Sequence, residues 1–116
     1  MNKMSTKKIV FLGPSISGKT ITSRRWRNYD DTRYTFGVEV HPVIYNGAKY
    51  NIWDCAGRAV FQGLREGYCI GADGAIIFSD GSNIDTYLET TRDIGKVIIV
   101  DTRQSLPNIS ILDQFL

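Results

Sequence analysis

The fold of this chain is decided by one stretch, Ile9-Val10-Phe11-Leu12-Gly13-Pro14-Ser15-Ile16-Ser17-Gly18-Lys19-Thr20. Its first four residues are apolar and partly β-branched, which predicts a strand buried on both faces. The rest matches the pattern G-x-x-x-x-G-K-[ST], whose glycines permit a tight turn and bring backbone N–H groups close to an anion. A helix that begins near Gly18 would direct its N-terminus at the same anion. The stretch therefore predicts a strand, a phosphate-binding loop and a helix in succession.

The motif gives its two last residues separate chemical roles. Lys19 supplies a point charge for β- and γ-phosphates, and the Thr20 hydroxyl is a candidate Mg²⁺ ligand. The alternative is a glycine-rich turn beside a surface lysine, which fits less well because a strand precedes the motif and a second motif follows it. The predicted nucleotide-binding segment comprises Gly13, Pro14, Ser15, Ile16, Ser17, Gly18, Lys19, Thr20 and Ile21.

Composition limits the classes of protein that fit. A length of 116 residues predicts a single domain over 1–116 with a modest core. The net charge of +2 is too small to indicate nucleic acid or an anionic membrane as a partner, and no apolar run is long enough to span a bilayer. The polar start at 1–8 lacks the apolar stretch of a secretory signal. Two cysteines outside any CxxC pattern, Cys55 and Cys69, fit a reduced intracellular compartment, cytoplasmic or nuclear, as small and mostly buried side chains.

The pattern of apolar residues alternates between strands and helices. Asn46-Gly47 is a strong two-residue hairpin signal, so the strands on either side of it are expected to be antiparallel. In the expected helix over 19–27, Ile21 and Trp26 are predicted to face inward, with the arginines solvated. The fold class predicted is therefore α/β, with a mostly parallel central sheet and one antiparallel edge hairpin. Strands are expected over 8–12, 38–45, 49–53, 74–78 and 96–100, helices over 19–27, 84–94 and 109–116, a helical turn or two within 61–70, and a loop over 28–36.

A second motif, Trp53-Asp54-Cys55-Ala56-Gly57, follows a hydrophobic strand. A carboxylate there suits Mg²⁺ and its water shell, and Gly57 can offer a bare backbone N–H to a γ-phosphate. Taken alone, Asp54 would be interpreted as a turn-forming residue at a strand end, and it is the upstream phosphate-binding loop that favours the metal role. Because ligands of such sheets lie outside the carboxyl ends of the strands, Gly13 and Asp54 are expected to converge on one site.

These residues resemble the small Ras-type GTPases, and the segments 36–42, 61–70 and 74–78 resemble the Ran-type nuclear-transport GTPase in particular. The resemblance runs from about Lys8 to Asp80 and implies a three-layer P-loop GTPase fold that binds GTP or GDP with Mg²⁺. It makes 28–37 and 57–69 the two switch segments, which the γ-phosphate and Mg²⁺ hold in place. Thr35 then corresponds to the switch threonine that meets Mg²⁺ and the γ-phosphate. Tyr29 lies near the aromatic residue that packs on guanine, although a loop aromatic covering the core is an equal alternative.

Departures from the family concern hydrolysis and base reading. Ser15 stands where the family has glycine, and Arg58 where it has the glutamine that orients the attacking water. The candidate catalytic residues are Lys19, Thr35 and Arg58. Because Arg58 has no acceptor for that water, it is interpreted as an exposed switch residue, and hydrolysis is expected to be slow. The alternative is that Arg58 stabilises charge on the γ-phosphate. After the strand at 96–100 the chain reads Asp101-Thr102-Arg103-Gln104-Ser105, and the aspartate that reads guanine is absent at its position.

The family's last strand, last helix and second base loop have no counterpart in this sequence, which ends at Leu116. The strand at 96–100 is therefore expected to be a sheet edge. A short amphipathic cover is expected from the apolar residues of the last segment, and if they do not fold back, a homodimer or a domain swap is expected. The apolar residues of that segment are Ile109, Ile111, Leu112, Phe115 and Leu116.

Three functions follow from these observations. The first is a guanine-nucleotide-binding GTPase with weak or impaired hydrolysis. The second is an inactive binding module, a decoy for regulators or transport receptors that the switch segments would engage. The third is a nucleotide binder that recognises phosphates without selecting guanine. His41 lies within the Ran-like stretch on an expected strand, and a structural role is predicted for it.

Overall fold

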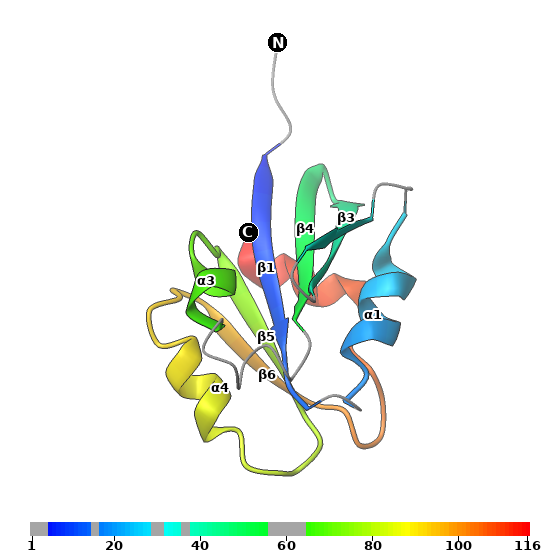
Figure 1. Cartoon of the computed structure of the whole chain (residues 1–116). Coiled ribbons are helices and arrows are strands. Elements are labelled where there is room, and N and C mark those ends of the chain that lie inside the picture. The colour runs from blue at the N-terminus through cyan, green and yellow to red at the C-terminus, as the bar shows by residue number, and fades with distance from the viewer. Residues whose placement is uncertain (1–4, 15–16, 29–31, 36–37, 56–64) are drawn as a thin grey trace.

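The structure is a computed structural model, and it describes residues 5–14, 17–28, 32–35, 38–55 and 65–116 (Figure 1). None of the described helices has the length and apolar content that a membrane crossing needs. The strands are β1 (Thr6–Leu12), β2 (Arg33–Thr35), β3 (Val38–Tyr45), β4 (Ala48–Cys55), β5 (Gly74–Ser79) and β6 (Val97–Asp101). The helices are α1 (Lys19–Trp26), α3 (Arg65–Cys69), α4 (Asp85–Thr90) and the 3-10 helix η1 (Ile109–Phe115).

The described strands form one sheet in the order β2-β3-β4-β1-β5-β6. Strand β1 pairs in parallel with β4 and β5, and β5 pairs in parallel with β6. The hairpin β3–β4 is antiparallel and turns at Asn46-Gly47, where both residues have positive φ. The predicted fold class, a mostly parallel α/β sheet with one antiparallel hairpin, is confirmed, and β6 lies at an edge as expected.

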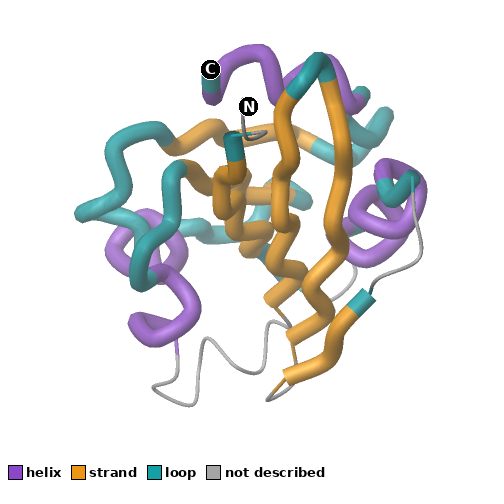
Figure 2. Tube along the Cα trace, turned by 90° about the horizontal axis from the view of Figure 1, so that it is seen from above, coloured by secondary structure: helices purple, strands orange, loops and turns teal. Residues whose placement is uncertain are grey.

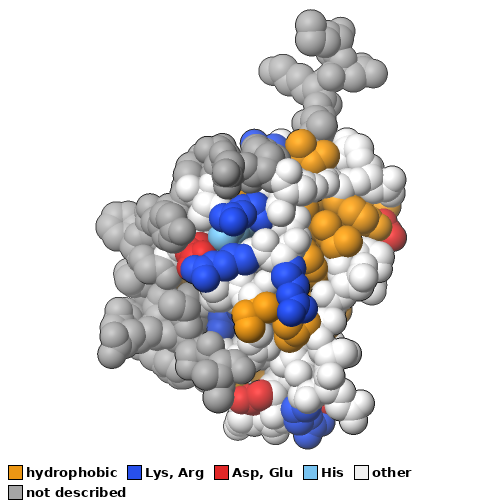
Figure 3. Space-filling model, turned by 90° about the vertical axis from the view of Figure 1, so that its right-hand side faces the viewer, with side chains coloured by type: hydrophobic (Ala, Val, Ile, Leu, Met, Phe, Trp, Pro, Cys, Tyr) orange, Lys and Arg blue, Asp and Glu red, His pale blue; other side chains and the backbone are white. Residues whose placement is uncertain are grey.

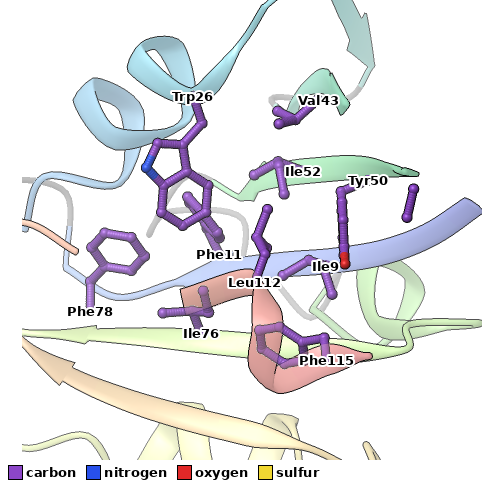
Figure 4. Packing of buried hydrophobic residues seen from close by; sticks show 11 residues of the cluster. Ile9, Phe11, Trp26, Val43, Tyr50, Ile52, Ile76, Phe78, Leu112 and Phe115 are labelled. Carbon is purple, nitrogen blue, oxygen red and sulfur yellow. The ribbon is translucent and has the colours of Figure 1, made fainter. Parts of the chain in front are cut away.

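Helices cover both faces of this sheet (Figure 2). On one face, Trp26 of α1 and Leu112 and Phe115 of η1 pack against apolar residues of β1, β3, β4 and β5 (Figure 4). Phe11 contacts Trp26 edge to face, with ring centroids 5.2 Å apart. On the other face, Tyr68 of α3 and Tyr87 of α4 pack against the remaining core residues. Strand β1 lies inside the sheet, and its Ile9, Val10, Phe11 and Leu12 alternate between the two clusters.

Three local expectations were wrong. The segment 28–36 is not entirely loop, because Arg33–Thr35 pair with β3 as the strand β2. Ile21 does not face inward, as 54% of its surface is exposed. The inward face of α1 is formed by positions 19, 22, 23 and 26, which recur at helical spacing and exclude position 21. The helix expected over 84–94 is only Asp85–Thr90, and a turn follows from Thr91.

Candidate functional site

The loop between β1 and α1 depends on two glycines with positive φ. Gly13 has φ 146°, and a Cβ there would lie 2.4 Å from the Phe78 carbonyl oxygen. Gly18 has φ 92° and precedes the first residue of α1, and a Cβ there would lie 2.4 Å from a methyl group of Leu106. Between them, the backbone N–H of Ser17 donates to the Pro14 carbonyl. A side chain at Gly13 would collide with backbone, whereas one at Gly18 would displace the Leu106 side chain and strain a backbone of positive φ.

Lys19 lies across this loop with its ammonium group turned inward. Its Nζ donates to the carbonyl oxygens of Gly13 at 2.8 Å and Pro14 at 2.7 Å. Burial lowers the pKa of Lys19, while the nearby Asp54 carboxylate acts in the opposite direction. An ammonium group has three donors, and the third is unused by the residues that the structure describes. Lys19 is thus fixed by the loop, and the described residues leave one of its donors to an anion.

Asp54 and Thr20 meet at the carboxyl ends of β4 and β1. The Thr20 hydroxyl donates to Oδ2 of Asp54 at 2.5 Å. The other oxygen, Oδ1, is buried and has no hydrogen-bond partner in the described part of the chain. Burial raises the pKa of Asp54, and the Thr20 hydrogen bond and Lys19 only partly offset this. Asp54 is a residue of β4, opposite Glu39 of β3, because the strand expected over 49–53 continues to Cys55.

A hydroxyl and a carboxylate side by side are the hard oxygen ligands that Mg²⁺ prefers, together with water. The buried, unpartnered Oδ1 of Asp54 is a group that a cation would stabilise, because an unpaired buried carboxylate oxygen is costly. No group of at least three His, Cys, Asp or Glu residues in the described ranges could hold a metal. A Mg²⁺ ion needs few protein ligands where phosphates and water supply the rest, so Thr20 and Asp54 fit this ion.

A cavity of about 490 Å³ opens beside the start of α1. Thr102, Arg103 and Leu106 form the wall that follows β6, and Asp80 lies after the end of β5. Arg103 is held by Asp101, with its Nε 3.0 Å from Oδ1 and a terminal nitrogen 2.5 Å from Oδ2. These hydrogen bonds lower the pKa of Asp101 to about 2. The cavity is lined by Ser17, Gly18, Thr20, Ile21, Asp80, Thr102, Arg103 and Leu106.

The structure brings most of the motif residues together. Gly13, Pro14, Ser17, Gly18, Lys19, Thr20, Ile21 and Asp54 lie around the β1–α1 loop and the cavity. Thr35 ends β2, where its backbone pairs with Val38. Ser15, Ile16, Tyr29, Gly57 and Arg58 lie outside the described residues.

Sequence reasoning missed part of the surroundings. The cavity wall formed by Thr102, Arg103 and Leu106 was not assigned to the site, and neither was Asp80. The available signal was position: these residues follow the carboxyl ends of β5 and β6, the edge at which such sheets bind ligands.

Comparison with known families matches residues 8–104 to the family described as "Roc: Ras of Complex, Roc, domain of DAPkinase". The matched range contains the β1–α1 loop, Asp54 and the cavity residues up to Arg103. Among solved structures, the Arl6 BBS3 small GTPase of Trypanosoma brucei, with bound nucleotide analogue GppNp, is similar with a TM-score of 0.64. The likeness covers 96% of this chain and 77% of that chain at 18% sequence identity, so it is one of fold.

Proposed function

The chain belongs to the Roc family of Ras-like domains, and on this premise we propose that it binds GTP and GDP with Mg²⁺ at the β1–α1 loop. One observation carries the proposal: Lys19 and Thr20 are fixed beside Asp54, whose Oδ1 has no partner within the described ranges. Lys19 and the loop N–H groups would bind the phosphates, and Thr20 and Asp54 would hold the metal, joined by Thr35 when the γ-phosphate is present. Bound Mg²⁺ would neutralise charge on the phosphate oxygens.

Nucleotide titration of stripped protein tests this proposal. We expect GDP and GTP to bind in the presence of Mg²⁺, and Lys19→Met to weaken both by about 10- to 100-fold, because a charged hydrogen bond is lost. Met keeps the length of the apolar stem but removes the ammonium group. Lys96→Met is the matched control, since Lys96 is an exposed lysine outside the site. A folded wild-type protein that binds neither nucleotide would exclude this function.

We further propose that hydrolysis is slow, with water attacking the γ-phosphate in line and without an evident base. Ser15 and Arg58 replace a glycine and a glutamine of the resembling GTPases, and a guanidinium cannot accept a proton from water. We expect Arg58→Gln to raise the single-turnover hydrolysis rate, and Arg25→Gln, at an exposed position of α1, to leave it unchanged. A lower rate in Arg58→Gln would instead assign Arg58 to charge stabilisation.

The second candidate function is a binding module for regulators or transport receptors of Ran-type GTPases. The first support is the Ran-like sequence of the switch segments. The second is that Asp101 is engaged by Arg103, so that among the described residues only Asp80 offers the cavity a carboxylate with which to recognise a base. Such a module would act inside the cell, in the cytoplasm or the nucleus. A pull-down with Ran's regulators and transport receptors, with and without nucleotide, separates the two functions: binding that ignores nucleotide favours the module.

A further inference from the structure

His41 is completely buried on β3, and both of its ring nitrogens have a partner. Nε2 lies 2.9 Å from Oε1 of Glu39, and Nδ1 lies 3.1 Å from Oγ1 of Thr32. A carboxylate can only accept, so Nε2 carries the ring proton and Nδ1 accepts from the Thr32 hydroxyl. Burial lowers the pKa of His41, which favours this neutral ring. His41 therefore joins β3 to the residue that precedes β2.

Helix α1 and Arg27, the residue that follows it, hold the two ends of this chain of hydrogen bonds. Arg24 donates to both oxygens of Glu39, at 3.2 and 2.9 Å. Arg27 donates to the Thr32 hydroxyl at 2.9 Å. Figure 3 looks onto the side of the molecule on which α1 lies and shows Lys and Arg side chains gathered beside acidic ones. Thr32 and His41 are thus tied to each other and, through the two arginines, to the helix that follows the phosphate-binding loop.

The hydrogen bond between Thr32 and His41 also bears on the register in which β2 pairs with β3. Arg33 pairs with Val40, and Thr35 pairs with Val38. Continued by one residue, the same antiparallel register places Thr32 opposite His41. A strand of three residues at a sheet edge specifies its register weakly, and a slip of one residue would turn every side chain to the other face. A buried cross-strand hydrogen bond at its start opposes that slip.

We propose that His41 is a positioning residue: by hydrogen-bonding Thr32 it fixes the register of β2 and so the place of Thr35. A slip of one residue would move Thr35 by about 3.3 Å, which is enough to lose a metal or phosphate contact. The consequence for nucleotide rests on the proposed function, in which Thr35 meets Mg²⁺ and the γ-phosphate. The effect of the His41–Thr32 hydrogen bond on the register of β2 is a property of the nucleotide-free protein and can be tested there.

The first experiment measures amide hydrogen exchange in nucleotide-free protein. Thr32→Val keeps the shape of the side chain but removes the hydroxyl, and it should speed exchange at 33–35 and 38–40 by about tenfold. Thr32→Ser restores the hydroxyl and should restore protection. Thr86→Val, a half-buried threonine of α4 far along the chain, is the matched control and should leave these amides unchanged. Equal exchange in Thr32→Val and wild type would overturn the proposal, whether or not nucleotide binds.

The second experiment compares affinity for GDP with affinity for a non-hydrolysable GTP analogue. Thr35 is proposed to contact the γ-phosphate, so Thr32→Val should weaken the analogue about tenfold while changing GDP affinity less than twofold. Thr32→Ser should behave as wild type. Equal weakening of both nucleotides would assign Thr32 a general structural role and overturn the positioning role. If the wild-type protein binds neither nucleotide, the proposed function is wrong. The hydrogen-exchange data would still show whether the His41–Thr32 hydrogen bond fixes the register of β2.

Discussion

Asp54 occupies a position that is unfavourable for a charge unless a cation is present. It is 5% exposed, its pKa is raised by burial, and one of its oxygens lacks a partner in the described ranges. A raised carboxyl pKa means that folding disfavours the ionised form of Asp54, so the metal-free protein loses stability as pH rises through that pKa. A bound metal reverses this preference, because it stabilises the ionised form.

Asp54→Asn should therefore separate stability from metal dependence. Without metal at pH 7, the variant should melt about 2–5 °C above wild type, since it removes a buried charge. Its affinity for GDP should no longer respond to EDTA, whereas EDTA should weaken GDP binding to wild type. Differential scanning calorimetry and nucleotide titration measure the two effects, with Asp93→Asn on the exposed surface as control. If EDTA weakens GDP binding to Asp54→Asn as much as to wild type, Asp54 does not hold the metal.

His41 gives the protein a second dependence on pH, in the opposite direction. Burial holds its pKa below the usual 6.5, so the unfolded chain takes up a proton first as pH falls. The free energy of unfolding should keep its full His41 contribution above about pH 6.5. It should fall as pH drops toward the pKa of His41 in the folded protein, by at most about 1.4 kcal/mol per pH unit. The sequence has one histidine, so His41→Gln should flatten urea-unfolding free energies between pH 7.5 and 5.5. If the unfolding free energy of His41→Gln changes with pH as steeply as that of wild type, groups other than His41 cause the pH dependence.

At the scale of elements, η1 has a larger role than its length suggests. Leu112 and Phe115 are buried against β1, β4 and β5, and Phe115 contacts the Cα side of Gly74. Asn108 starts the helix by accepting from the Ser110 N–H. The cover expected from the last segment is thus present at these two residues, while Leu116 is 71% exposed. A homodimer was expected only if the last segment did not fold back, and Leu112 and Phe115 do fold back onto the sheet.

Leu112→Ala should lower the free energy of unfolding by about 2–4 kcal/mol, because it leaves a cavity in the core beneath η1. Leu116→Ala deletes the same atoms at an exposed position and should change it by less than about 0.5 kcal/mol. Urea unfolding followed by tryptophan fluorescence suits this pair, since Trp26 belongs to the same cluster as Leu112. Two variants of equal stability would mean that η1 does not form part of the core.

The elements that sequence could predict are those whose signal is local. Strands β1 and β5 are continuous apolar runs, and the β3–β4 hairpin is marked by Asn46-Gly47, so each was placed within a few residues. Strand β2 carries no such signal, because Arg33–Thr35 become a strand only by pairing with β3. The site divides in the same way. Its loop residues are contiguous and were predictable, whereas Asp80 and Thr102 reach the cavity through the topology of the sheet.

At the scale of the molecule, the features of the site gather at one end of the sheet. The carboxyl ends of β1, β4, β5 and β6 supply the phosphate-binding loop, Asp54, Asp80 and the wall after Asp101. The aromatic residues of the covering helices, among them Trp26, Tyr87 and Phe115, pack on the two faces of the sheet. Binding at that edge would therefore join segments far apart in sequence, and it should raise the stability of the whole fold.

This linkage allows base selectivity to be measured through stability. A nucleotide at 100 times its Kd adds about 2.7 kcal/mol, which corresponds to a rise in Tm of about 10 °C for a domain of this size. The described cavity presents Asp80 as its carboxylate, and Asp101 is paired with Arg103, so we expect GTP to be favoured over ATP by less than about tenfold. At equal concentrations with Mg²⁺, the two nucleotides should then differ by at most about 1.4 kcal/mol in the stability they add. Lys19→Met, with its affinity lowered about 10- to 100-fold, should reduce the added stability at the same nucleotide concentration to about 1.4 to 0.4 kcal/mol. A large shift with GTP and none with ATP would mean that groups beyond the described cavity read guanine.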